Sequence, residues 1–176
     1  RMVKNGEVFP IVKGLYETER SVSPHLLAAC IYGPSYLSFE FALSYYGMIP
    51  ERVFTVTSAT YNKKKRKTYD TLFGKFYFQD VPKEVFSYEI ITVSEGNYSF
   101  RIASPEKALC DMLYTMGPVG NAEEMRALLF ENFRIDEDEF SKLDIKTIEQ
   151  LCEKYHSTNI KKLCVLMRRM KNENGF

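Results

Sequence analysis

Five consecutive basic residues in the segment YNKKKRKT are the side chains of this 176-residue sequence best suited to binding chemistry. The candidates for phosphate binding in this run are Lys63, Lys64, Lys65, Arg66 and Lys67. Adjacent positive charges cannot be buried together, so the run is predicted to lie in water on a loop or at strand ends. Cations that neutralise phosphates release counterions and add salt-dependent affinity for nucleic acid. Such contacts position a nucleic acid rather than read its sequence, and a solvated loop without a ligand is the alternative.

A second pair of residues with suitable spacing is Lys107 and Asp111, one helical turn apart. Lysine preceding the acid is the weaker orientation, so we expect an ion pair that contributes a few tenths of a kcal/mol. The favoured interpretation of this pair is structural, as an anchor between a helix and a sheet. Acid–base catalysis by carboxylates cannot be assigned to particular residues from the sequence.

Metal and nucleophilic chemistry find little support. Cys152 and His156 would share one helix face, but no second pair with ligand spacing accompanies them. No Gly-x-Ser-x-Gly motif or phosphate-binding glycine loop is present. The sequence therefore predicts no catalytic residue, no metal ligand and no cofactor. The four cysteines are interpreted as free thiols, mostly buried, in a reducing cytoplasm.

Composition sets the class of protein. Hydrophobic residues at 45% and aromatic residues at 14% suffice for a packed core, and the length fits one domain or one domain with part of another. The net charge of +1 identifies no partner by itself. No apolar run approaches the roughly 20 residues that span a bilayer, and no signal-peptide pattern opens the sequence. We therefore expect a cytoplasmic protein without a membrane partner.

The stretch from Tyr36 to Thr57 organises the expected fold. Ser38 is predicted to cap a helix through its hydroxyl, and Gly47 followed by Pro50 should end that helix. The β-branched alternation from Val53 onward predicts a strand to about Ala59.

Residues typical of turns and helix caps predict where the remaining helices and strands begin and end. A helix is expected from Ser21 to Tyr32, with Pro24 at its first position. Two hairpins should follow, and then helices capped by polar residues. The expected hairpin strands are 68–71 with 75–80 and 88–94 with 98–103; the expected caps are Ser104, Asn121, Asp136, Asp144 and Ser157 or Thr158. This order predicts an α+β fold, with a small antiparallel or mixed sheet covered by helices and a C-terminal helical bundle.

The first residues suggest the end of another module. Arg1 to Lys4 would be the last turn of a helix that stops at Asn5-Gly6, and two short strands would follow up to Tyr16. A helix end followed by a β-ribbon is how a winged helix-turn-helix domain finishes, and an ordinary hairpin is the alternative. On the first interpretation, residues 1–18 are the remnant of that domain, residues 19–176 form the main domain, and further sequence is expected upstream.

Two strings carry a resemblance to a known family. The helix–Gly–Pro–strand segment YLSFEFALSYYGMIPERVFTVT and the later RIASPEKALCDMLY are similar to the AbiEi-type antitoxins of bacterial type IV toxin–antitoxin (abortive infection) systems. The similarity is clearest from Tyr36 to about Tyr114 and weakens after Gly120. The resemblance implies a winged-helix domain that binds operator DNA and represses its own operon. It also implies a larger domain that opposes a nucleotidyltransferase-type toxin, and it places Lys4 and Lys13 on the DNA-binding wing.

Three functions stay open from the sequence. The first is an antitoxin and transcriptional regulator with operator DNA as partner. The second is a stand-alone DNA-binding regulator without a toxin, and the third is a small enzyme acting on nucleotides or nucleic acid. A deep pocket lined by converging carboxylates would favour the third. The oligomeric state is not predicted.

Overall fold

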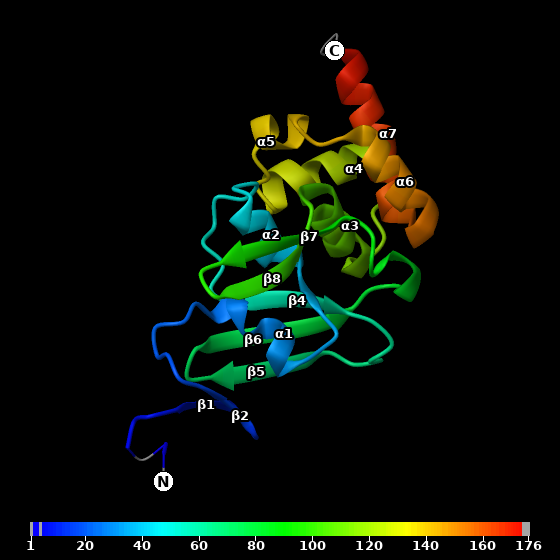
Figure 1. Ribbon diagram of the computed structural model, residues 1–176. Helices are drawn as coiled ribbons and strands as arrows, with labels where there is room; N and C mark the ends of the chain where they lie inside the picture. The colour runs from blue at the N-terminus through cyan, green and yellow to red at the C-terminus, as the bar shows by residue number, and fades with distance from the viewer. Residues whose placement is uncertain (1, 4, 174–176) are drawn as a thin grey trace.

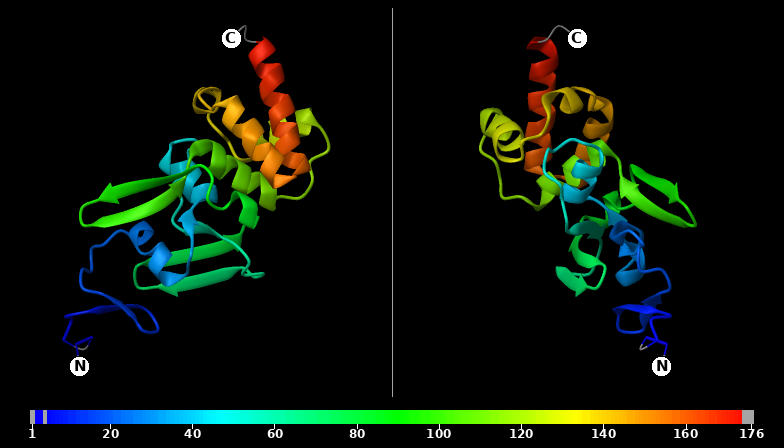
Figure 2. Two further views of the ribbon diagram at one scale, coloured as in Figure 1. Left: turned by 45° about the vertical axis from the view of Figure 1, so that its right-hand side comes forward. Right: turned by 90° about the vertical axis from the view of Figure 1, so that its left-hand side faces the viewer.

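The computed structural model describes residues 2–3 and 5–173, which fold as mixed α+β (Figure 1). Within these residues lie seven α-helices, a six-stranded mixed sheet and a separate two-stranded sheet. The α+β class and the mixed sheet are therefore confirmed. The C-terminal helices gather at one end of the molecule and the two-stranded sheet lies at the other (Figures 1 and 2).

The six-stranded sheet joins two hairpins through a pair of central strands. Its strand order is β5-β6-β4-β3-β8-β7, with parallel pairing between β4 and β6 and between β3 and β8. The strands are β3 (Tyr36–Leu37), β4 (Val56–Thr60), β5 (Lys67–Thr71), β6 (Gly74–Asp80), β7 (Ile90–Glu95) and β8 (Tyr98–Ala103). Both expected hairpins are confirmed, although the short central strand β3 was not predicted.

Period-two alternation decides which side chains of β6 are buried. Phe76 and Phe78 are fully buried on one face, and Tyr77 between them lies on the other face at intermediate exposure, as the sequence predicts. The strand expected from Val53 begins only at Val56, because the ladder with β6 starts at the pair Val56 and Phe76. Phe54, expected within that strand, is 78% exposed.

Helix α2 (Phe39–Tyr45) forms where the sequence predicts it, but its cap is a different residue. The Ser38 hydroxyl makes no cap hydrogen bond. Instead the Thr57 hydroxyl, on β4, accepts the Phe41 N–H at 3.0 Å and donates to the Ser38 carbonyl at 2.6 Å. Gly47 ends the helix with φ +70°, in the left-handed conformation that glycine adopts without strain. The predicted Ser38 cap is wrong because a hydroxyl from the next strand occupies that role.

The helices that follow the sheet begin at the predicted caps. The side chains of Ser104, Asn121, Asp136 and Asp144 each accept a first-turn N–H. The helices are α3 (Pro105–Thr115), α4 (Ala122–Ala127), α5 (Glu137–Ser141), α6 (Ile145–Tyr155) and α7 (Thr158–Glu173), with a π-helical turn at Leu128–Asn132. α3 packs against α2, α6 and α7, so it joins the sheet layer to the helical end.

The N-terminal part differs from the expected single helix. β1 (Phe9–Val12) and β2 (Leu15–Glu17) form the two-stranded ribbon. The segment expected as one helix is a 3₁₀ turn (Pro24–Leu26) followed by α1 (Ala28–Ile31). The reason is that the N–H groups of Leu26 and Leu27 bond three residues back, to Ser23 and Pro24, rather than four. None of the described helices combines the length and apolarity needed to cross a bilayer.

Candidate functional site

The basic run occupies the loop between β4 and β5, and one carboxylate fixes the conformation of that loop. Asp80 Oδ2, at the end of β6, accepts the backbone N–H groups of Lys63 at 2.6 Å and Lys64 at 2.7 Å. Its Oδ1 accepts the Thr60 hydroxyl at 2.7 Å. Asn62 and Lys64 both adopt left-handed backbone angles, at φ 56° and 57°. The loop is therefore built around Asp80 rather than held by water alone.

The five cations do not have equal roles. The Lys63 ammonium donates to the Gly33 carbonyl at 2.9 Å and lies 5.0 Å from the centre of the Tyr32 ring, so it helps to fix the loop. Lys67 is the first residue of β5 and is half-buried. Lys64, Lys65 and Arg66 are exposed. Among residues 2–3 and 5–173, no salt bridge engages any side chain of the run, so no acidic side chain neutralises its positive charge.

The two other predicted DNA-binding residues belong to the N-terminal segment. Lys13 is exposed in the turn between β1 and β2, beside Gly14 at φ +84°. Lys4 lies outside the described residues. Lys13 is thus carried by the two-stranded ribbon, and the basic run by a loop of the six-stranded sheet.

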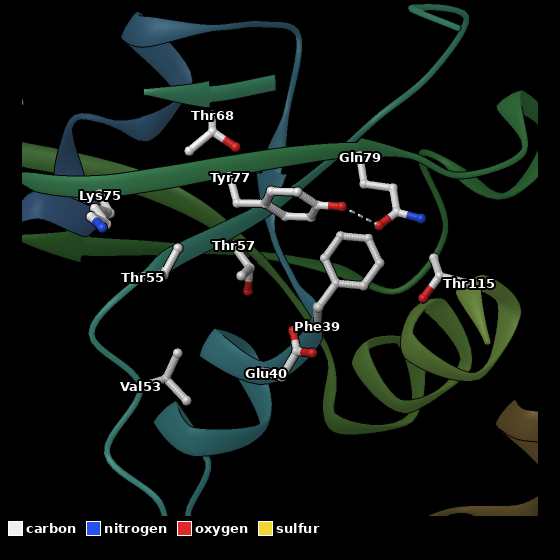
Figure 3. A pocket seen from close by; sticks show the side chains of 10 residues that line it. All are labelled: Phe39, Glu40, Val53, Thr55, Thr57, Thr68, Lys75, Tyr77, Gln79 and Thr115. Atoms are coloured by element: carbon white, nitrogen blue, oxygen red, sulfur yellow. Dashed lines mark hydrogen bonds between the residues drawn. The ribbon is translucent and has the colours of Figure 1, made fainter. Parts of the chain in front are cut away.

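A pocket that no sequence pattern indicated lies on the face of β6 that carries Lys75, Tyr77 and Gln79 (Figure 3). Its volume is about 470 Å³. Thr57, Lys75, Tyr77 and Gln79 line it from the sheet, and Phe39 lines it from the start of α2. These residues are distant in sequence and meet only because β4 pairs with β6 and α2 packs against β4. Gln79 also lines a second pocket of about 240 Å³, together with Lys64, Lys65, Arg66 and Asp80.

Lys107 and Asp111 form a buried cluster rather than a surface pair. Both side chains are fully buried, and Lys107 Nζ lies 2.6 Å from Asp111 Oδ1. Lys107 Nζ also donates to the hydroxyls of Tyr36 at 2.7 Å and Tyr155 at 2.6 Å. Asp111 accepts the hydroxyls of Tyr36, Ser38 and Tyr155. The estimate of a few tenths of a kcal/mol assumed a solvent-exposed helix face, whereas both side chains are fully buried.

Burial also decides the protonation of the two tyrosines. Burial raises the pKa of Tyr36 well above its usual value of 10, and the negative charge of Asp111 adds to this effect. The pKa of Tyr155 is raised well above 10 for the same two reasons. Both phenols are therefore neutral donors that hold the carboxylate. Since solvent does not reach the cluster, its role is to tie β3, α3 and α6 together, as the structural interpretation of the pair predicts.

The pair considered for metal binding does not form a ligand set. His156 is exposed and ends α6 in a left-handed conformation at φ 52°. Cys152 lies beside Cys164, and burial, followed by this neighbouring thiol, raises the pKa of Cys164 to about 12. In the part of the chain that the structure describes, no group of three His, Cys, Asp or Glu side chains could hold a metal ion.

Comparison of the chain with models of known protein families gave no match. A search of curated proteins found no match either. The function must therefore be argued from the geometry of the basic loop, the pocket and the N-terminal ribbon, together with the two strings that resemble the antitoxin family.

Proposed function

We propose that this chain is an AbiEi-type antitoxin that represses its own operon by binding operator DNA and opposes a nucleotidyltransferase-type toxin in the cytoplasm. The observation that supports DNA binding is the basic loop between β4 and β5. Asp80 fixes its backbone, and Lys64, Lys65 and Arg66 face solvent. Cations on a loop whose backbone is fixed lose less conformational entropy on meeting a phosphate backbone than cations on a flexible segment. The antitoxin half rests on the resemblance of the two strings.

The hydrogen bonds of the first residues support the winged-helix part of the proposal. Gly6 N–H donates to the Val3 carbonyl and Glu7 N–H to the Met2 carbonyl, with Gly6 at φ +70°. This pair of bonds around a left-handed glycine is the Schellman pattern of helix ends. A helix end followed directly by the β1–β2 ribbon is the order in which a winged helix finishes. Lys13 would then contact DNA from the tip of the wing, with Lys4 before it.

The DNA-binding half is tested by the salt dependence of operator affinity. The test variant carries Lys64→Gln, Lys65→Gln and Arg66→Gln, and the matched control carries Lys146→Gln, Lys161→Gln and Lys171→Gln, three exposed lysines of α6 and α7. Each lost phosphate contact should lower the slope of log affinity against log salt by about 0.9. Electrophoretic mobility shift at several salt concentrations, with DNA from upstream of the gene, measures this slope.

The loop variant should bind the operator more weakly and with a shallower slope, whereas the control should match the unmodified protein. Equal slopes for the two variants would contradict a role of this loop in DNA binding. A Lys13→Gln variant tests the wing separately, because Lys13 lies on a different sheet.

The antitoxin half is tested by co-expression with the toxin gene that this proposal expects beside this one, encoding a nucleotidyltransferase. Growth of cells that express the toxin should be restored by this protein. If operator binding is intact and growth is not restored, the chain is a regulator without antitoxin activity.

A further inference from the structure

The pocket of Figure 3 has two aromatic walls and a hydrogen-bonding end. Thr57 and Tyr77 are register partners on the parallel strands β4 and β6, so their side chains lie on the same face of the sheet. Phe39 reaches this face from the first position of α2. Lys75 and Gln79 lie at opposite ends of the row that β6 contributes to the pocket. Flat rings at the wall of a pocket offer stacking surfaces to a planar ligand.

The backbone of Phe39 is held in an unfavourable conformation at this wall. Its φ of 57° lies in the left-handed region, which is an outlier for a bulky residue. Nearby residues are held in place, since the Ser38 hydroxyl donates to Asp111 and the Phe41 N–H, two residues after Phe39, donates to Thr57. Such strain persists where surrounding bonds impose it, and it occurs preferentially at ligand sites. The ring is thus fixed in place before any ligand arrives.

Gln79 connects this pocket to the basic loop. Its side-chain oxygen accepts the Tyr77 hydroxyl at 2.9 Å, which fixes the direction of the amide. Among the described residues, no group accepts a hydrogen bond from its NH₂, which leaves two donors for a ligand. Because Gln79 also lines the pocket of Lys64, Lys65 and Arg66, the stacking surface and the phosphate-binding cations adjoin at this residue.

We propose that the pocket binds the base of a nucleotide, with the phosphate of that nucleotide on Lys64, Lys65 and Arg66. Tyr77 provides the stacking surface, Phe39, which is 3% exposed, backs the pocket from the core, and the Gln79 amide donates to the edge of the base. The ring and the amide both face the base, and the cations that adjoin Gln79 face the phosphate. The nucleotide is either free or an unpaired residue of a single strand.

This inference goes beyond the proposed operator binding and does not depend on it. A duplex keeps its bases stacked inside, so it can use the cations of the loop but not the pocket. Changes in the pocket therefore separate the two activities. Changes in the loop affect both.

The test measures fluorescence anisotropy of a short fluorescein-labelled single strand of mixed sequence, bound by the full chain. The variants are Tyr77→Leu, which removes the stacking ring, and Gln79→Leu, which removes the amide at similar size. Gln150→Leu, an exposed position on α6, is the matched control. Loss of stacking should weaken binding about fivefold to 100-fold, the range for one base on one aromatic side chain.

The proposal is supported if Gln79→Leu and Tyr77→Leu bind the single strand more weakly than the unmodified protein while Gln150→Leu binds it equally well. Both pocket variants should retain their affinity for the operator. Because Gln79 is not part of the buried core, Gln79→Leu keeps the test valid if Tyr77→Leu does not fold. Competition by the four nucleoside monophosphates distinguishes a free nucleotide from a nucleotide within a strand as the ligand. Displacement of the labelled strand by one of them shows that a free nucleotide suffices. Single-strand affinity that is the same for both pocket variants and the control would overturn the proposal, and so would an absence of binding at low salt.

Discussion

Lys107 and Asp111 keep their charges inside the protein because the hydroxyls of Tyr36, Ser38 and Tyr155 complete their hydrogen bonding. Removing two charges from water costs several kcal/mol for each ion, and only good geometry with additional hydrogen bonds offsets this cost. The cluster is therefore a place where single substitutions have large effects. Tyr36 belongs to β3, Lys107 and Asp111 to α3, and Tyr155 to α6, so the cluster holds these three elements in one fixed arrangement.

Substitution of one member of this ion pair should be strongly destabilising. Lys107→Met leaves the Asp111 carboxylate buried without its cation, which costs about 3–5 kcal/mol of unfolding free energy. The double variant Lys107→Met, Asp111→Leu should cost less than the sum of the two single variants, since neither charge then remains. Urea denaturation followed by circular dichroism gives the values. Lys142→Met, which breaks the exposed pair with Glu139, is the control and should have a far smaller effect.

The tyrosines of the cluster predict a decline of stability at alkaline pH. The pKa of Tyr155 is raised by burial and by Asp111, so above pH 10 the unfolded chain releases this proton while the native state keeps it. Stability from this group is complete below pH 10 and falls above it, by about 1.4 kcal/mol per pH unit. Tyr155→Phe should show a shallower decline in urea unfolding between about pH 9 and pH 11. Tyr16→Phe, at an exposed position, should follow the unmodified protein; equal declines for both would contradict the assignment.

At the scale of elements, the loop between β4 and β5 combines a fixed backbone with exposed cations. Asp80 accepts two backbone N–H groups and one hydroxyl, and none of these donors is a charged side chain. The carboxylate thus organises the loop without pairing with the ammonium groups. Removal of the Asp80 charge therefore has two opposing effects on nucleic-acid binding: the surface becomes more positive, and the loop loses hydrogen bonds that fix its backbone.

We expect Asp80→Asn to weaken nucleic-acid binding although it makes the surface more positive. The amide cannot accept all three hydrogen bonds as the carboxylate does, so the loop should lose order and its amides should exchange hydrogen faster. Hydrogen–deuterium exchange and binding anisotropy measure the two effects. Asp70→Asn removes a neighbouring exposed acid whose nearest cation, Lys75, is 3.9 Å away, and it should leave binding equal or stronger. Stronger binding by Asp80→Asn would show that charge alone decides affinity.

At the scale of the whole molecule, the described strands form two separate sheets. The β1–β2 ribbon shares no ladder with the six-stranded sheet, and Ile11 is the residue of the ribbon that is buried in the core. The helical end lies far from the ribbon in every view (Figures 1 and 2). We therefore infer that residues 19–176 contain the elements needed for their own core.

A chain that begins at Glu19 should keep one cooperative urea transition. The loss should exceed the roughly 1.5–3 kcal/mol that burying one side chain such as Ile11 contributes, because Phe9, Val12 and Leu15 also pack against the core. Circular dichroism during urea titration measures this, and a matched variant of the full chain, Ile11→Ala, should reproduce part of the loss. If the shortened chain unfolds without a cooperative transition, the ribbon is part of the main domain rather than a separate module.

The sequence by itself determined the elements whose signals act over a few residues. The caps at Ser104, Asn121, Asp136 and Asp144 and the hairpin turns are local, because each hydrogen bond or turn joins residues close along the chain. The same is true of the exposure of the basic run, since adjacent like charges exclude burial whatever the fold.

Tertiary structure alone decided what these elements form together. Thr57 replaced Ser38 as the cap of α2, and Lys107 became fully buried, because segments distant in the chain pack at both places. The pocket between Phe39, Tyr77 and Gln79 likewise exists only after β4 has paired with β6. Burial and long-range pairing depend on the whole chain, and no pattern within a short window of the sequence records them.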